Sequence, residues 1–382
     1  MGKNLAIKYS PVVDERFTRE SQATLVLNNS YEFTGVDTVK VYSIPIVGMT
    51  DYSRTGSNRY GSPSDLTRNV QTLRVTRDRA FTFIIDKGDK IQSQMVSDAG
   101  KALARQLKEV VEPEYEAYVY STMAAAATAH GNYSTTAASK SNAYELLLAG
   151  NESLGDHNVP DQGRVALCSY RFANFLKQDS SFMKYSNQSQ EMLIKGVIGE
   201  VDGTKIVKVP SSRLPAGAAF ILAHPSATTA PKQLADYRIH DDPPGISGWL
   251  VEGRFIYDAF VLNEKADAVY YHGSQAVLKN LSVGTAATAT GKSTILVNGL
   301  PDGTGSAYYY KTGTEKTTVA YDNVISTTAS GSVTGTLYGW TALTNGAEIT
   351  PTSGDTLIQV VEVENTTSMK AKALGQAILN IG

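Results

Sequence analysis

The strongest helical pattern in the chain is DKIQSQMVSDAGKALARQLKEVVEPEYEAYVYSTMAAAAT, residues 89–128. Its apolar side chains recur at helical spacing, at Ile91, Met95, Ala99, Leu103, Leu107 and Val110. Asp89 is a suitable N-cap, and Pro113 is expected to kink or break the helix near Glu112. The pattern therefore predicts a helix of roughly 35 residues, about three times the usual length in globular domains.

Two segments precede this helix. Residues 1–33 have weak periodicity, which predicts an extended arm that becomes ordered only against partners. In residues 34–86, VDTVKVYSIPIVG and VQTLRVTRDRAFTFII alternate as strands around a middle rich in Gly, Ser, Tyr and Arg. Because an isolated hairpin this long cannot bury one face alone, it predicts contact with a neighbouring chain.

The predicted hairpin is rich in arginine. Its six arginines are Arg54, Arg59, Arg68, Arg74, Arg77 and Arg79. Residues 1–90 carry a net charge of +3 and the remainder −5, for a total of −2. Since the two parts complement each other, we interpret the arginines as contacts to an acidic neighbouring copy rather than to nucleic-acid phosphate.

The rest of the chain divides near residue 275. Residues 140–155 predict an amphipathic helix, GRVALCS (163–169) a buried strand and YRFANFLKQ (170–178) a short helix. A hairpin around Asp202-Gly203, a short helix within residues 218–239 and later strands complete a mixed α+β block. Residues 276–382 favour Thr, Gly, Val and Tyr in short alternating runs, which predicts an all-β, sandwich-like domain. In that domain KAKALGQAILNI (370–381) is expected to form a closing strand rather than a helix.

The sequence contains no complete catalytic or nucleotide-binding pattern. GTAATATGKST (284–294) looks like a phosphate loop, but six residues rather than four separate Gly284 from Gly291, and a β-branched strand follows. We expect a loop entering the β domain, with Lys292 at its surface. Cys168 ends an apolar run and is expected to be a buried hydrophobic residue rather than a nucleophile. No enzyme activity and no cofactor are predicted.

Other polar and aromatic groups leave alternatives open. HDDPPG (240–245) could hold a metal, although its two prolines favour an exposed connecting loop. An acidic cluster is expected to form a solvated or intersubunit face rather than a catalytic pair, and consists of Glu109, Glu112, Glu114 and Glu116. Four aromatic side chains could stack on a sugar, although a strand burying alternate tyrosines is favoured; they are Tyr308, Tyr309, Tyr310 and Trp340.

The order of arm, long hairpin, long helix and α+β lobe resembles the major capsid proteins of tailed bacteriophages with the Hong Kong 97 fold. FTFIIDKGDKIQSQMVSDAGKALARQLKEVVEPEYEAYVYSTMA (81–124) is similar to their strand and spine-helix passage, and SGWLVEGRFIYDAFVLNEKADAVYYH (247–272) to their late peripheral strands. The resemblance covers residues 1–275. It implies an N-terminal arm (1–33), an extended loop (34–86), a spine helix with peripheral and axial domains (87–275) and an added C-terminal immunoglobulin-like domain (276–382).

The resemblance also implies a function and partners. Copies would form hexamers and pentamers of an icosahedral virion head, assembled in the bacterial cytoplasm. Portal and scaffolding proteins would be partners, double-stranded DNA would meet the inner face without sequence preference, and no membrane would be involved. Because no lysine lies between Lys40 and Lys87, no isopeptide bond from the loop is expected. The alternatives are an encapsulin-type nanocompartment shell, or a bacterial surface or adhesive protein, which the absence of a signal peptide disfavours.

Overall fold

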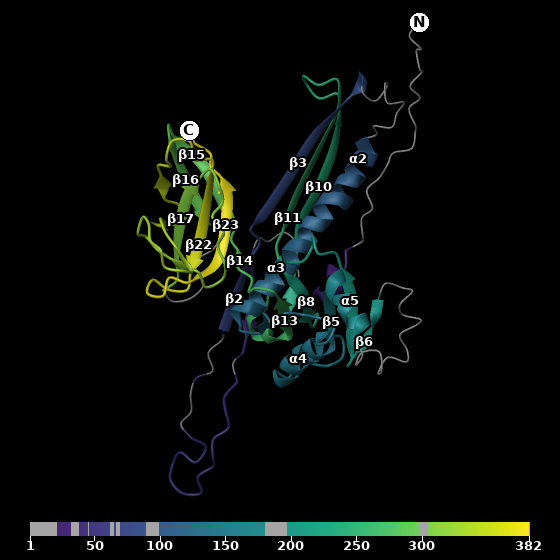
Figure 1. Ribbon diagram of the computed structural model, residues 1–382, viewed down its shortest axis with the longest axis vertical. Coiled ribbons are helices and arrows are strands. Elements are labelled where there is room, and N and C mark those ends of the chain that lie inside the picture. Colours follow the sequence, from purple (N-terminus) through teal and green to yellow (C-terminus); the bar gives the residue numbers. More distant parts are fainter. Residues whose placement is uncertain are drawn as a thin grey trace.

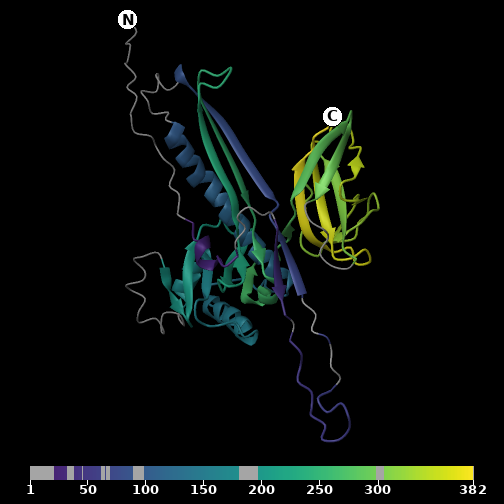
Figure 2. The same ribbon diagram turned by 180° about the vertical axis from the view of Figure 1, so that it is seen from behind.

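The computed structural model describes residues 21–31, 38–44, 46–61, 65, 69–88, 99–179, 197–297 and 305–381. A long helix runs along a narrow three-stranded sheet and ends against a six-stranded sheet (Figure 1). A hairpin projects from one end of this body, and a β domain stands beside it (Figure 2).

The long helix is continuous through Pro113. It consists of α2 (Ala99–Gln106), a π-helical turn (Leu107–Val111) and α3 (Glu112–Ala129). Of the kink or break expected near Glu112, the break does not occur, because the wider π turn shortly before Pro113 accommodates a ring that would clash with a preceding carbonyl in a regular helix. The predicted N-cap at Asp89 lies outside the described residues.

Antiparallel strands β10 (Lys232–Asp241), β11 (Gly248–Tyr257) and β3 (Arg77–Asp86) form the narrow sheet, in that order. One face packs against the long helix: the ring of Tyr115 lies 6.0 Å from Phe255 and 5.5 Å from Tyr257. The helix and this sheet therefore form one elongated unit.

The six-stranded sheet is the centre of a three-layer lobe. Its strands, in spatial order, are β4 (Tyr133–Ser134), β13 (Val269–Gly273), β8 (Ala218–Ala223), β5 (Val165–Ser169), β7 (Thr204–Val209) and β6 (Val197–Val201). Leu167 and Ile221 face α3, whereas Cys168 and Phe220 face α4 (Ala143–Asp156) and α5 (Tyr170–Gln178). Burial raises the pKa of the Cys168 thiol, as expected of a buried hydrophobic residue.

The helix expected within residues 218–239 does not form. The chain instead makes β8, β9 (Thr228–Thr229) and the start of β10, and β9 pairs with β12 (Phe260–Val261). Pro225 and Pro231 remove backbone donors on both sides of the β-branched pair, which disfavours a helix here. A 3-10 helix, η4 (Asn263–Ala268), follows β12.

The hairpin is shorter than its sequence pattern predicted. β1 (Thr38–Ser43) pairs with β2 (Asn69–Arg74), and the run expected as one strand to residue 85 then changes sheets and continues as β3. Before the hairpin, the short 3-10 helix η1 (Ala23–Val26) buries Ala23 and Val26 against the core beside α3. This part of the expected arm is therefore docked on its own chain, and residues 1–20, 32 and 33 lie outside the described residues.

The described residues of the C-terminal domain form three small sheets. The first sheet has the strand order β14 (Lys279–Asn280), β23 (Ala371–Ile378), β22 (Leu357–Val363), β17 (Ala307–Gly313) and β20 (Thr341–Leu343). The second has the order β15 (Val283–Ala289), β16 (Lys292–Val297) and β21 (Glu348–Ile349). The third pairs β18 (Val324–Ile325) with β19 (Thr336–Leu337). The closing strand is as predicted. The loop expected at residues 284–294 is instead the β15–β16 hairpin, which turns at Gly291 with φ of +75°.

A short junction connects this domain to the rest of the described chain and makes contacts with both. Val277 packs on the main core, whereas the next residue, Leu278, packs on a core of the C-terminal domain. β14 pairs in parallel with β23, and Asn280 Nδ2 donates to Ser121 Oγ of α3 at 2.8 Å. One short segment thus belongs to both parts.

Candidate assembly interface

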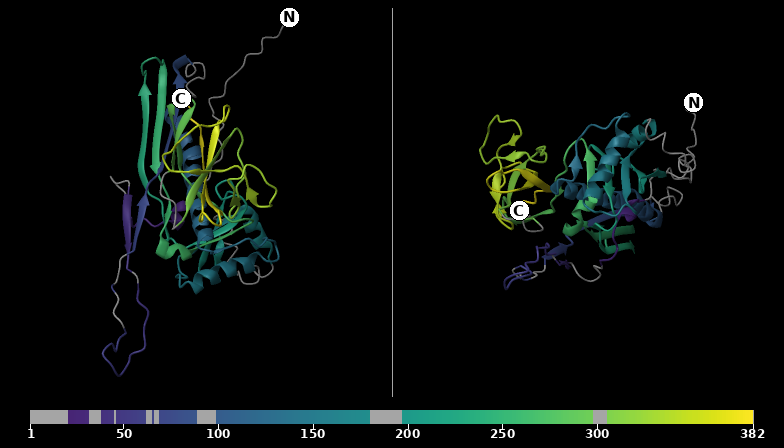
Figure 3. Two further views of the ribbon diagram at one scale, coloured as in Figure 1. Left: turned by 90° about the vertical axis from the view of Figure 1, so that its left-hand side faces the viewer. Right: turned by 90° about the horizontal axis from the view of Figure 1, so that it is seen from below.

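The hairpin tip exposes large apolar side chains. Ile46 is 97% exposed, Met49 101% and Tyr60 86%, on a loop that projects away from the body (Figure 3). Further exposed apolar residues of the hairpin are Tyr42, Ile44, Val47, Tyr52 and Val70. Burying one such side chain stabilises by about 1.5–3 kcal/mol, and contiguous exposed apolar surface marks an interaction site.

The opposite face of the hairpin is already held by its own chain. Leu73 and Val75 are buried against Leu262. Gln71 Nε2 donates to the carbonyl of Val261 at 3.1 Å, and the Asn263 amide donates back to Gln71 Oε1 at 3.0 Å. The hairpin therefore has one face fixed to the body and a second that presents apolar groups outward.

A single carboxylate sets the direction in which the hairpin leaves the body. Asp258, which is 3% exposed, accepts from the Thr76 amide at 2.9 Å, Thr76 Oγ1 at 2.8 Å and the Tyr118 hydroxyl at 2.8 Å. Burial, reinforced by Asp258, raises the pKa of Tyr118, so its hydroxyl remains a donor. Since Tyr118 lies on α3, the turn between β2 and β3 is tied to the long helix.

Two of the arginines predicted to contact a neighbouring copy, Arg77 and Arg79, also make contacts within their own chain. Arg77 lies 4.4 Å from the Tyr118 ring centroid, and its Nη2 is 3.6 Å from Glu114 Oε1. Arg79 Nε lies 2.8 Å from the same oxygen. β3 carries both residues onto the helix rather than out to the tip, and their contact with a neighbouring copy stays a prediction.

The other four arginines have different positions. Arg54 and Arg59 are exposed at the hairpin tip, where Arg59 Nε donates to the carbonyl of Gly56 at 3.1 Å. Arg74 ends β2 with an exposed side chain, and Arg68 lies outside the described residues.

Part of the acidic cluster is buried, contrary to the expectation of a solvated or intersubunit face. Glu116 has no exposed surface and forms an ion pair with Arg213. It also accepts from the Gln22 amide at 2.8 Å and from the Tyr120 hydroxyl at 2.5 Å. This carboxylate faces the core side of α3 and joins three separate segments.

The aromatic platform is not formed. Trp340 is 1% exposed, Tyr308 4% and Tyr309 8%, and Tyr310 is half-buried. Tyr308 and Tyr309 point to opposite faces of the β17 sheet, and both faces are covered by hydrophobic cores. The favoured alternation of buried and exposed tyrosines is therefore also wrong.

The HDDPPG segment completes β10 with His240 and Asp241 and then forms the favoured connecting loop to β11. His240 Nε2 lies 3.2 Å from Glu252 Oε2, and Asp242 pairs with Lys87. Across the part of the chain that the structure describes, His, Cys, Asp and Glu form no group of three or more suited to a metal ion. Within the same residues, no helix is both long and apolar enough to cross a membrane.

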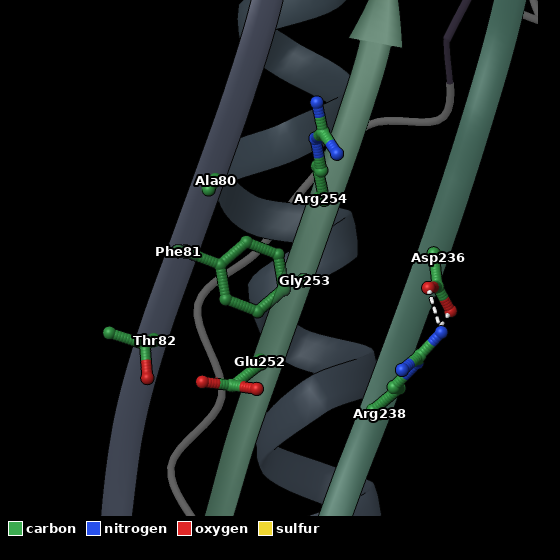
Figure 4. A pocket seen from close by; sticks show the side chains of 8 residues that line it. All are labelled: Ala80, Phe81, Thr82, Asp236, Arg238, Glu252, Gly253 and Arg254. Carbon is green, nitrogen blue, oxygen red and sulfur yellow. Dashed lines mark hydrogen bonds and ion pairs between the residues drawn. The ribbon is translucent and has the colours of Figure 1, made fainter.

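The face of the three-stranded sheet away from the helix is polar and hollowed (Figure 4). Residues from all three strands line a volume of about 560 Å³ there. Arg254 Nη2 lies 2.5 Å from Asp78 Oδ2, and this hydrogen bond lowers the pKa of Asp78. Asp236 pairs with Arg238 at 2.8 Å. Sequence alternation did not reveal this face, because its charges come from strands far apart in the chain.

An exposed apolar hairpin projecting from a helix-and-sheet body is typical of a subunit that associates with other chains. The family model described as phage capsid protein matches residues 65–271, more than half of the chain. The chain therefore belongs to the phage capsid protein family and is a structural component of a phage head shell.

Solved structures share the fold at low sequence identity. One from Mycobacterium phage Che8 has 18% identity and a TM-score of 0.61, covering 72% of this chain and 98% of that chain. The capsid of the cyanophage P-SCSP1u has 12% identity and a TM-score of 0.56, covering 71% and 93%. The mature capsid of bacteriophage PhiM1 has 11% identity and a TM-score of 0.53, covering 71% and 92%. A comparison with curated proteins gives no match.

Proposed function

We propose that this chain is the major capsid protein of a tailed bacteriophage with the Hong Kong 97 fold, which tiles an icosahedral head as hexamers and pentamers. The three-stranded sheet with its long helix corresponds to a peripheral domain, the six-stranded lobe to an axial domain and the hairpin to an extended loop. The observation that carries the proposal is the nearly full exposure of Ile46 and Met49 on a projecting loop. Exposed apolar surface of this extent marks a site of contact with another molecule, and in a shell protein that molecule is a neighbouring subunit.

The C-terminal domain is proposed to be an immunoglobulin-like addition that strengthens contacts between capsomers. The Che8 structure is covered almost entirely while just over a quarter of this chain stays unmatched, about the share that residues 276–382 represent. The family match likewise ends at residue 271. A glycan-binding role has lost its support, since the aromatic side chains that suggested it are largely buried.

The proposed partners are those expected of a protein that forms a phage head shell. The hairpin arginines supply charged contacts to neighbouring copies. They are Arg54, Arg59, Arg68, Arg74, Arg77 and Arg79, of which Arg79 keeps 58% of its side chain exposed beside Glu114. Portal and scaffolding proteins assist assembly in the host cytoplasm, and packaged double-stranded DNA meets the inner face without sequence preference.

Negative-stain microscopy of the purified protein tests the proposal, with shells as the expected result. Ile46→Asp and Met49→Asp should abolish shells while leaving thermal unfolding unchanged, because both side chains are already in solvent. Val333→Asp is the matched control, since Val333 is 66% exposed on the C-terminal domain and outside the hairpin. Normal shells from both hairpin variants would show that the apolar loop is not an assembly surface.

A further inference from the structure

One sulfur atom of the hairpin tip is fully open to solvent. Met49 is 101% exposed. The other described sulfur atoms are protected: Met123 and Cys168 have no exposed surface, and Met369 is half-buried against a core of the C-terminal domain. Among the residues that the structure describes, Met49 therefore has the one thioether or thiol that a soluble oxidant can reach freely.

The Met49 side chain takes no part in holding the tip together. The contacts within the tip belong to other residues: the rings of Tyr52 and Tyr60 lie 5.0 Å apart, and the Ser53 amide donates to the Arg59 carbonyl at 2.9 Å. A chemical change at the Met49 sulfur therefore leaves the subunit folded and alters only the contact that the tip later makes with another molecule.

Peroxide changes an accessible methionine in one defined step. One oxygen atom passes from hydrogen peroxide to the sulfur: the O–O bond breaks, an S–O bond forms, the sulfur loses two electrons and water leaves. Methionine sulfoxide reductases return the sulfur to the thioether with two thiols, which become a disulfide, and a second water leaves. The sulfoxide is polar where the thioether was apolar, so it disrupts apolar interfaces that contain methionine.

We propose that Met49 is a reversible oxidation site that controls whether a subunit can enter a shell. As a thioether, Met49 extends the exposed apolar surface of Ile46 and Val47. As a sulfoxide, it brings an oxygen acceptor into that surface, and burying this acceptor without a donor weakens the contact. A closed shell covers the tip and protects the sulfur from further oxidation. This inference rests on the proposed function, in which the tip is buried between subunits.

Peroxide treatment of the unassembled subunit tests the site. Peptide mass spectrometry should show the sulfoxide at Met49 and none at Met123, with thermal unfolding unchanged. The protein concentration that gives half-maximal shell formation, measured by sedimentation, should rise about tenfold or more. Methionine sulfoxide reductases A and B with dithiothreitol should restore the original concentration. Unchanged assembly of subunits that are fully oxidised at Met49 would overturn the proposal.

Two variants separate Met49 from the other six of the seven methionines. Met49→Leu is compared with itself before and after peroxide, and its assembly concentration should not change, because the oxidisable sulfur of the tip is gone. Met369→Leu lies outside the hairpin and should stay as sensitive to peroxide as the wild type. If peroxide impairs Met49→Leu as strongly as the wild type, the effect arises elsewhere and the proposal fails.

Protection within the shell gives a measurement that needs no substitution. At one peroxide concentration, Met49 should be oxidised at least about tenfold more slowly in assembled shells than in free subunits, because susceptibility follows exposure. Equal rates would contradict the inference. Wild-type shells that form equally well from oxidised and reduced subunits overturn this inference alone, whereas absence of wild-type shells overturns the proposed function.

Discussion

Replacing Glu116 with alanine should cost about 3–5 kcal/mol of unfolding free energy, the usual result of breaking a buried ion pair. The carboxylate has no exposed surface and its partner Arg213 is only 6% exposed, so the remaining guanidinium cannot be hydrated. Glu116→Gln keeps an oxygen acceptor for Gln22 and Tyr120 and should cost less, about 1–3 kcal/mol.

Urea unfolding of the unassembled subunit, followed by circular dichroism, measures these differences. The double change Glu116→Leu/Arg213→Leu should recover much of the loss, because apolar side chains of similar volume often replace a buried pair without penalty. Amide exchange at Gln22 gives a local signal and should accelerate in Glu116→Ala. A loss below about 1 kcal/mol, with unchanged exchange at Gln22, would refute the view that this carboxylate joins the three segments.

Four further outcomes are expected. Gly375→Ala should destabilise the C-terminal domain by about 1–3 kcal/mol in thermal unfolding, because an added Cβ would meet Val283 Cγ2 at 2.5 Å; Gly284→Ala, with its nearest neighbour at 3.9 Å, should be neutral. Burial lowers the pKa of His272 below its ordinary 6.5, so the unfolded chain binds a proton first as pH falls. The unfolding free energy that neutral His272 contributes is therefore complete above pH 6.5 and is lost as the pH falls from 6.5 to the lower pKa of the folded state. His272→Gln should flatten this dependence of the unfolding free energy on pH, measured by denaturant unfolding across that range. Lys292→Ala removes an exposed ion pair with Glu348 and should leave shells intact by microscopy. Denaturing gels of wild-type shells should show no covalent subunit ladder, since no lysine lies between Lys40 and Lys87.

Local patterns predicted much of the fold. Helical spacing located α4, and in α5 the side chain of Ser169 caps the helix by accepting from the Phe172 amide at 3.3 Å. Alternation and turn residues located the β5 strand and the closing strand β23. These elements follow from residues that are near one another in sequence.

Features that depend on distant contacts were not predictable. The alternation of residues 70–85 gives no sign that pairing changes at Thr76, because the carboxylate that fixes the turn, Asp258, lies 182 residues away. The contacts of Arg77 and Arg79 with Glu114 were not predicted for the same reason. Burial of both Tyr308 and Tyr309 depends on layers covering both faces of one sheet, which periodicity within a single strand does not report.

The junction at β14 has a mechanical consequence. Because β14 pairs in parallel with β23 and is bonded to Ser121 of α3, tension applied to the C-terminal domain loads these strands in shear and passes directly into the long helix. Val277 and Leu278 are packed in different cores, so the segment has little slack to take up. The C-terminal domain is therefore expected to follow movements of the long helix closely rather than to swing on a free linker.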